Sequence, residues 1–96
     1  MDSDTVVLQD AYASVLAIDV QYKLADFNTK KKLKKYRDKA FNVYTLARLE
    51  LLTDEVICTD DDVQEMKNIR QEVEQAADTQ LLITGIIRFV KFLITL

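Results

Sequence analysis

The fold is decided by the C-terminal segment, residues 59–96, which reads TDDDVQEMKNIRQEVEQAADTQLLITGIIRFVKFLITL. No proline interrupts it, and the one glycine of the chain lies within it. Apolar residues recur at alternating spacings of three and four, which predicts one narrow seam along a helix. The seam consists of Met66, Ile69, Val73, Ala76, Gln80, Ile83, Ile87, Val90 and Ile94. We therefore expect a single helix over about residues 60–95.

A second apolar row begins beside the seam halfway along this helix. Its members are Leu82, Ile86, Phe89, Leu93 and Leu96. The first half of the helix thus needs one neighbour and the second half needs two, which three helices of one protomer do not obviously supply. We predict that this second row is a self-association surface. Gln80 interrupts the seam, either as a buried polar residue that fixes register or because the seam reaches solvent there.

The start of this helix carries the clearest boundary signal in the chain. Thr59 is a good N-cap, and Asp62 stands at the third helical position, as in a capping box. Asp60 and Asp61 add negative charge at the positive end of the helix dipole. These three aspartates lack the ligand spacing of a calcium loop, so we interpret them as a helix start.

A first helix is predicted over residues 4–27, with Ser3 or Asp4 as its cap. One face carries Val7, Ala11, Val15, Ile18, Tyr22 and Ala25. The nearly opposite face carries Leu16, Val20, Leu24 and Phe27, with the small Ala13 and Ala17. A helix that is apolar on two sides is expected to lie between two neighbours, which is a second indication of association.

A second helix is predicted over residues 30–52, capped by Asn28 or Thr29. Its core row comprises Leu33, Tyr36, Ala40, Val43, Ala47 and Leu51. Phe41, Leu46 and Leu49 lie off this row and are either scattered surface residues or a contact patch. After this helix, residues 56–58 form a short apolar plug that we expect to cover the end of the core.

These elements predict an all-α fold with one domain over residues 1–96. Short connections favour three long antiparallel helices in an up-down-up bundle. The third would be the longest, at about 54 Å against about 35 Å for the others, and would overhang the bundle. A sheet is disfavoured because the chain has no proline and only one glycine for tight turns.

The basic run KKKLKKYRDK, residues 30–39, is the second candidate for function. Its charged members are Lys30, Lys31, Lys32, Lys34, Lys35, Arg37 and Lys39, in a chain with net charge −3. Acidic residues concentrate instead between positions 50 and 78, so the protomer is expected to have a basic and an acidic end. The run is either a solvated face, a docking face for an acidic protein surface, a contact with an acidic membrane surface, or a nucleic-acid contact. Its one aromatic residue, Tyr36, lies on the core row, so no base-stacking platform is visible.

Residues that build catalytic or metal sites are scarce. The chain contains no histidine, and one glycine cannot make a phosphate-binding loop. We therefore predict no enzyme activity, no cofactor and no metal. Cys58 stands alone, which excludes an intramolecular disulfide and leads us to expect a reducing, cytoplasmic location. No transmembrane segment is predicted, because the most apolar stretch, residues 81–96, is short and contains two cations.

The sequence therefore predicts a non-enzymatic helical module that binds proteins. We expect it to self-associate, as a dimer, and to dock on another macromolecule by its charged and apolar faces. The first alternative is a nucleic-acid-associated regulatory protein that uses the basic run. The second is a membrane-active helix, because Thr84, Arg88, Lys91 and Thr95 form a narrow polar row in an apolar segment. No motif identifies a family, although small helical proteins without histidine occur among phage, plasmid and other mobile-element products.

Overall fold

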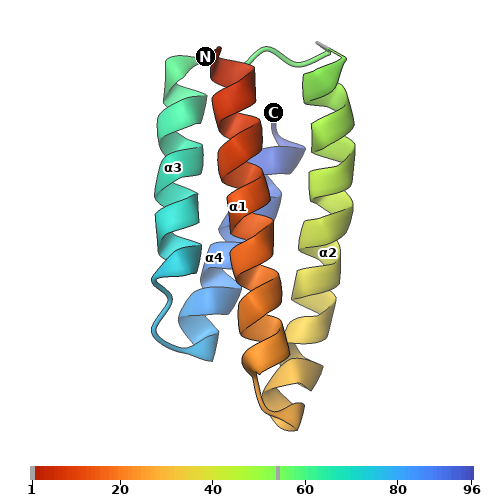
Figure 1. Ribbon diagram of the computed structural model, residues 1–96, viewed down its shortest axis with the longest axis vertical. Helices are drawn as coiled ribbons and strands as arrows, with labels where there is room; N and C mark the ends of the chain where they lie inside the picture. The colour runs from red at the N-terminus through yellow and green to blue at the C-terminus, as the bar shows by residue number, and fades with distance from the viewer. Residues whose placement is uncertain (1, 54) are drawn as a thin grey trace.

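The computed structural model describes residues 2–53 and 55–96, which fold into four helices (Figure 1). The helices are α1 (Ser3–Leu24), α2 (Phe27–Leu52), α3 (Asp60–Glu74) and α4 (Thr79–Ile94). The predicted all-α class is confirmed, and the described residues contain no strand. The predicted number of helices is wrong by one, because the expected third helix over residues 60–95 is divided into α3 and α4.

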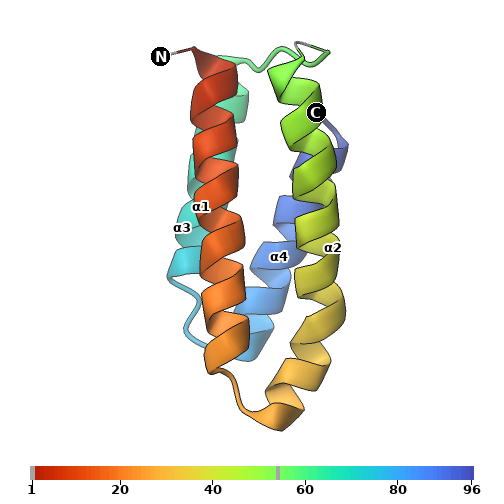
Figure 2. The same ribbon diagram turned by 45° about the vertical axis from the view of Figure 1, so that its right-hand side comes forward.

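The four helices form a bundle in which α1 and α4 lie diagonally opposite. α1 packs against α2 and α3, α4 packs against the same two helices, and α1 and α4 barely touch (Figures 1 and 2). The bundle measures 40 × 21 × 19 Å. α4 folds back beside α3, so the predicted overhang of a long third helix does not exist.

The division between α3 and α4 follows from the direction of their apolar faces. Met66, Ile69 and Val73 of α3 are fully buried. At 3.6 residues per turn, the row that begins at Leu82 lies on nearly the opposite side of a continuous helix. A straight helix would point that row into solvent, whereas a reversal over residues 75–78 buries it in the same core. Each large side chain buried in this way contributes about 1.5–3 kcal/mol, more than the few helical hydrogen bonds lost at the break.

Acidic N-caps begin three of the helices, and two of them differ from the predicted caps. Asp2, rather than Ser3 or Asp4, caps α1 and accepts the Thr5 N–H at 2.8 Å. Asp26, rather than Asn28 or Thr29, caps α2, so that helix begins earlier than predicted. Asp78 caps α4, a start that the sequence analysis missed.

The remaining helix, α3, begins as predicted. Thr59 and Asp62 form a reciprocal capping box: the Thr59 hydroxyl accepts the Asp62 N–H, and the Asp62 carboxylate accepts the Thr59 N–H. The connection before it only partly matches the predicted plug. Cys58 is buried and Val56 is half-buried, but Ile57 is exposed to solvent. Burial raises the pKa of the Cys58 thiol to about 12, so this cysteine is a poor nucleophile.

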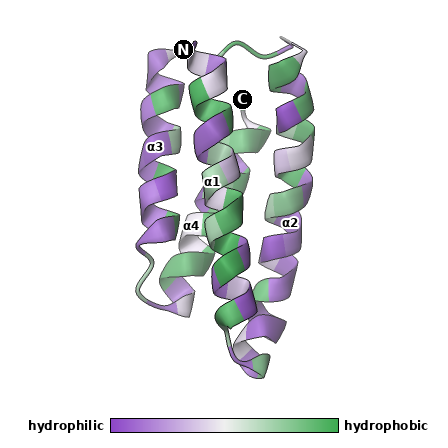
Figure 3. Cartoon of the chain, viewed as in Figure 1, coloured by the Kyte–Doolittle hydropathy of each residue, from purple (hydrophilic) through white to green (hydrophobic). Residues whose placement is uncertain are grey.

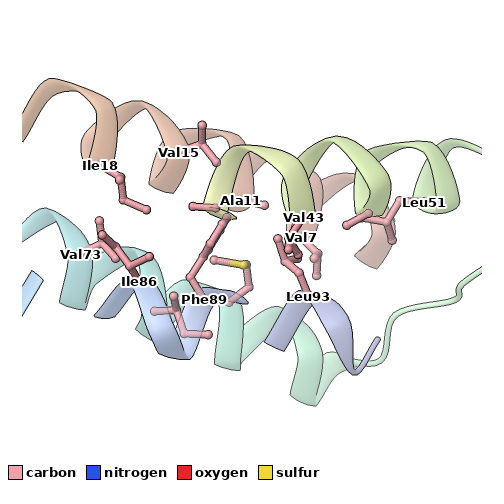
Figure 4. Packing of buried hydrophobic residues seen from close by; sticks show 14 of the residues in the cluster. Val7, Ala11, Val15, Ile18, Val43, Leu51, Val73, Ile86, Phe89 and Leu93 are labelled. Atoms are coloured by element: carbon pink, nitrogen blue, oxygen red, sulfur yellow. The ribbon is translucent and has the colours of Figure 1, made fainter. Parts of the chain in front are cut away.

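All four helices contribute to one hydrophobic core (Figure 4). Phe89 of α4 is its largest fully buried side chain. The predicted core faces of α1 and α2 are confirmed at Val7, Ala11, Val15, Ile18, Leu33, Ala40, Val43, Ala47 and Leu51. Gly85 is also explained, because a Cβ there would lie 3.2 Å from Val73 Cγ2, where α3 and α4 pack closely. The glycine therefore lets the two helices of the reversal approach one another.

Candidate interaction surfaces

The row predicted to mediate self-association lies inside the protomer. Leu82, Ile86, Phe89 and Leu93 are all buried, and Leu96 is half-buried against the same core. Figure 4 shows three of them among the core residues of α1 and α2. Their second neighbour is the rest of the chain itself, so they do not offer a surface to another copy in this fold. Gln80 is exposed in the protomer, as expected if the seam reaches solvent there.

The outer face of α1 is where the structure leaves a large apolar surface uncovered. A row spaced by four residues runs along it: Leu8, Tyr12, Leu16, Val20 and Leu24. Leu8 is half-buried and the other four are exposed, with Leu24 81% and Val20 54% accessible. Phe27, at the start of α2, is also exposed, at 74%. We call the five residues on α1 the α1 ridge.

The α1 ridge confirms the sequence inference that this helix is apolar on two sides. α1 lies nearest the viewer in Figures 1 and 3, and hydrophobic colour recurs along it, whereas α3 beside it is largely hydrophilic. Beside the ridge lies an open hollow between α1 and α3, lined by Ala13, Leu16, Ala17, Val20, Gln21 and Glu74. Because Ala13 and Ala17 have short side chains, the surface of α1 is recessed there, which forms the hollow. Tyr12 and Leu8 belong to the ridge although the sequence analysis did not assign them to it.

Smaller groups of exposed apolar side chains lie elsewhere. The end of α2 and the segment after it expose Leu46, Leu49, Leu52 and Ile57, and the outer face of α4 exposes Leu81, Ile87 and Ile94. Phe41 is half-buried against the core. Of the three residues off the core row of α2, Leu46 and Leu49 are therefore exposed and Phe41 is not.

The basic run divides into residues held by the fold and residues left free. Arg37 binds Asp38 at 2.7 Å, lies 3.4 Å from Asp19 of α1, and stacks over the rings of Tyr22 and Phe41. Lys34 pairs with Asp38 at 2.8 Å. The contacts of Arg37 with Asp19 and Tyr22 tie α2 to α1, so Arg37 has a structural role that the sequence analysis did not assign.

The other lysines of the run have no ion pair with any residue that the structure describes: Lys30, Lys31, Lys32, Lys35 and Lys39. Two of them lie over aromatic rings, Lys31 at 5.4 Å from the Phe27 centroid and Lys35 at 5.1 Å from the Tyr36 centroid. At helical spacing the five lysines spread over a wide arc of α2 opposite its core face. The arrangement is a charged helix end, not a narrow groove.

Charge is segregated between the two ends of the bundle. α1 and α3 begin at the end where α2 finishes (Figure 1). That end collects Asp2, Asp4, Glu50, Glu55, Asp60, Asp61 and Asp62, whereas the lysine run lies toward the other end. The acidic end is also tied together, because Asp4 Oδ1 accepts the Cys58 N–H at 2.6 Å. The protomer is therefore acidic at one end and basic at the other.

Ion pairs join α3 to its neighbours. Arg88 of α4 binds Glu65 at 2.7 Å and Glu72 at 2.6 Å. The hydrogen bond with Glu72 is the largest cause of the raised pKa of Arg88, and the one with Glu65 is the next. Arg70 of α3 binds Asp10 of α1 at 2.9 Å. The Arg88 contacts and the burial of the Leu82 row mean that one face of α4 packs on its own protomer, while Leu81, Ile87 and Ile94 on its outer face stay exposed.

Comparison with protein-family models, curated proteins and solved structures finds no match for this chain. Across residues 2–53 and 55–96, no group of three or more histidine, cysteine or acidic side chains is placed to hold a metal ion. None of the helices described combines the length and hydropathy needed to cross a bilayer. The α1 ridge and the two charged ends are the candidate interaction surfaces of the chain.

Proposed function

We propose that this protein is a non-enzymatic helical interaction module that self-associates and docks on another macromolecule through its apolar and charged faces. The α1 ridge carries this proposal. It is a continuous row of large apolar side chains on a helix whose other face already forms the core. Isolated exposed apolar residues are common, but contiguous ones on a small protein mark interaction surfaces.

The wild-type chain is expected to sediment as an oligomer, at least a dimer, and to dissociate to monomers on dilution. Changing Val20 and Leu24 together to serine removes apolar contacts that are exposed in the protomer, so folding should be retained. Each truncated anchor at an interface costs more than about 1 kcal/mol, so the dissociation constant should rise at least about tenfold. Sedimentation velocity over about ten to several hundred micromolar measures this change.

The matched control changes Leu46 and Leu49 to serine. Both are exposed leucines on α2, and their loss should leave self-association unchanged. Circular dichroism of each variant checks that the helices remain. A wild-type chain that stays monomeric over the whole concentration range would contradict the proposed self-association.

A nucleic-acid-associated function is the second candidate, and the unpaired lysines of α2 favour it. A protein that neutralises phosphates releases counterions, so its affinity falls as salt rises. The net charge of −3 and the acidic end of the bundle oppose binding to an extended duplex. For these reasons a nucleic-acid-associated function ranks second to docking on a protein.

A quadruple change of Lys31, Lys32, Lys35 and Lys39 to glutamine separates the two readings. All four side chains are exposed, so the fold should survive. If the run contacts duplex DNA through its five unpaired lysines, a gel-shift titration should show a log–log salt slope of about −4 to −5, and the variant should lose binding. If the run docks on protein instead, neither the wild type nor the variant should bind DNA in a salt-sensitive manner near physiological salt.

A further inference from the structure

The α1 ridge is symmetric about its central residue. Leu8 and Tyr12 precede Leu16 at spacings of four, and Val20 and Leu24 follow it at the same spacings. Residues spaced by four shift by about 40° per step around a helix, so the middle of the ridge, Tyr12, Leu16 and Val20, forms one face. A two-fold axis beside Leu16 matches this face with itself when two copies run antiparallel. Leu16 then faces its own counterpart, and Tyr12 faces Val20 of the partner. A self-complementary surface of this kind is what a two-fold dimer requires.

Charge selects the antiparallel orientation over the parallel one. In a parallel pair the acidic ends of the two protomers would lie together, and so would their basic ends. An antiparallel pair instead places the end with Asp2, Asp4 and residues 60–62 beside the lysine run of the other copy. Complementary ends favour encounter and fix orientation, and like-charge juxtaposition is disfavoured. A second copy of the chain thus supplies the charges that each end lacks.

The helix surface also permits close approach. Ala13 and Ala17 flank the ridge and leave the hollow between α1 and α3, which can receive an aliphatic side chain from a partner. Small residues beside large ones let two helices interdigitate. We propose that two copies of this chain pair antiparallel along the outer face of α1, about a two-fold axis beside Leu16, with the acidic end of each copy next to the basic end of the other. This inference rests on the proposed self-association and specifies its surface and orientation.

Cysteine cross-linking of the full-length chain tests this arrangement. Leu16→Cys should give a covalent dimer with a short bis-maleimide, because the two thiols meet near the axis. Leu24→Cys should not cross-link with itself, since its two copies are offset by about 24 Å along the helices at 1.5 Å per residue. A mixture of Tyr12→Cys and size-tagged Val20→Cys chains should cross-link to each other more than either does to itself. The wild-type chain is the control, because its only cysteine, Cys58, is buried.

Sedimentation of each cysteine variant before cross-linking establishes that it still associates. Self-cross-linking of Leu24→Cys at the level of Leu16→Cys would overturn the antiparallel arrangement in favour of a parallel one. A wild-type dimer in which none of these cysteines cross-links would place the interface elsewhere. Both results would leave the proposed self-association standing. A chain that is monomeric in sedimentation would instead remove the self-association and this dimer together.

Discussion

Phe89→Ala is expected to destabilise the protein by about 3–5 kcal/mol, which is the range for removing a fully buried phenylalanine. Phe89 is completely inaccessible and is the largest such side chain in the core. The free energy of unfolding of such domains is about 5–15 kcal/mol, so the variant should be close to the limit of stable folding. Urea unfolding followed by circular dichroism measures the loss, which should show as a lower midpoint.

Ile87→Ala provides the matched control on the same helix. Ile87 is 46% exposed and lies two residues from Phe89, so its truncation should cost less than about 1 kcal/mol. The comparison also tests the correction to the sequence analysis. If Phe89→Ala kept wild-type stability and lost only self-association, the Leu82 row would be an intermolecular surface after all.

Periodicity alone predicted which faces of α1, α2 and α3 form the core, whereas in α4 it placed the core on the seam of Ile83, Ile87, Val90 and Ile94 instead of the buried Leu82 row. Val7 and Ile18 on α1, Leu33 on α2, and Ile69 on α3 are all buried as expected. This part of the fold is local, because the 3.6-residue repeat sets which side chains share a face regardless of what packs there. Leu16, Val20 and Leu24 of the exposed ridge followed from the same reasoning, since two apolar faces are visible on the wheel without any knowledge of neighbours, whereas Leu8 and Tyr12 were not assigned to it.

The reversal between α3 and α4 was not predictable in the same way. Two apolar rows on different sides of one helical segment can both be buried in two ways. Either a second chain covers one row, or the helix breaks and the segment folds back on itself. The intramolecular solution is favoured because a tethered segment has a high effective concentration. No glycine or proline marks the break, and the N-cap Asp78 is its only strong local signal.

Ion pairs between distant positions also left no trace in the sequence. Asp10 and Arg70 are sixty positions apart and meet only because α1 and α3 pack side by side. Asp19 and Arg37 meet in the same way between α1 and α2. Composition placed the lysine run and the acids at different ends, but only the packed structure shows which charges are paired and which remain free.

The pair between Asp10 and Arg70 leads to the second large effect. Asp10 is only 6% exposed, and Arg70 Nη1 donates to its Oδ1 at 2.9 Å. Its other oxygen, Oδ2, is buried and has no hydrogen-bond partner among the residues described. Breaking a buried pair by removing one partner costs about 3–5 kcal/mol, because a charge is left uncompensated. Because the Arg70 side chain is 40% exposed, solvent screens the pair and lowers this cost. Arg70→Met should therefore reduce the free energy of unfolding by about 2–3 kcal/mol.

A second substitution shows whether the uncompensated charge is the cause. Asp10→Asn in the Arg70→Met background removes the charge while keeping the size of the side chain, and should recover at least about 1 kcal/mol. Arg88→Met is the comparison, since Arg88 pairs with glutamates that are themselves partly solvated, and should cost about 0–1 kcal/mol. Urea unfolding of the four chains measures all three differences. Equal losses for Arg70→Met and Arg88→Met, with no recovery from Asp10→Asn, would mean that solvent already stabilises the Asp10 carboxylate and that packing alone aligns α1 with α3.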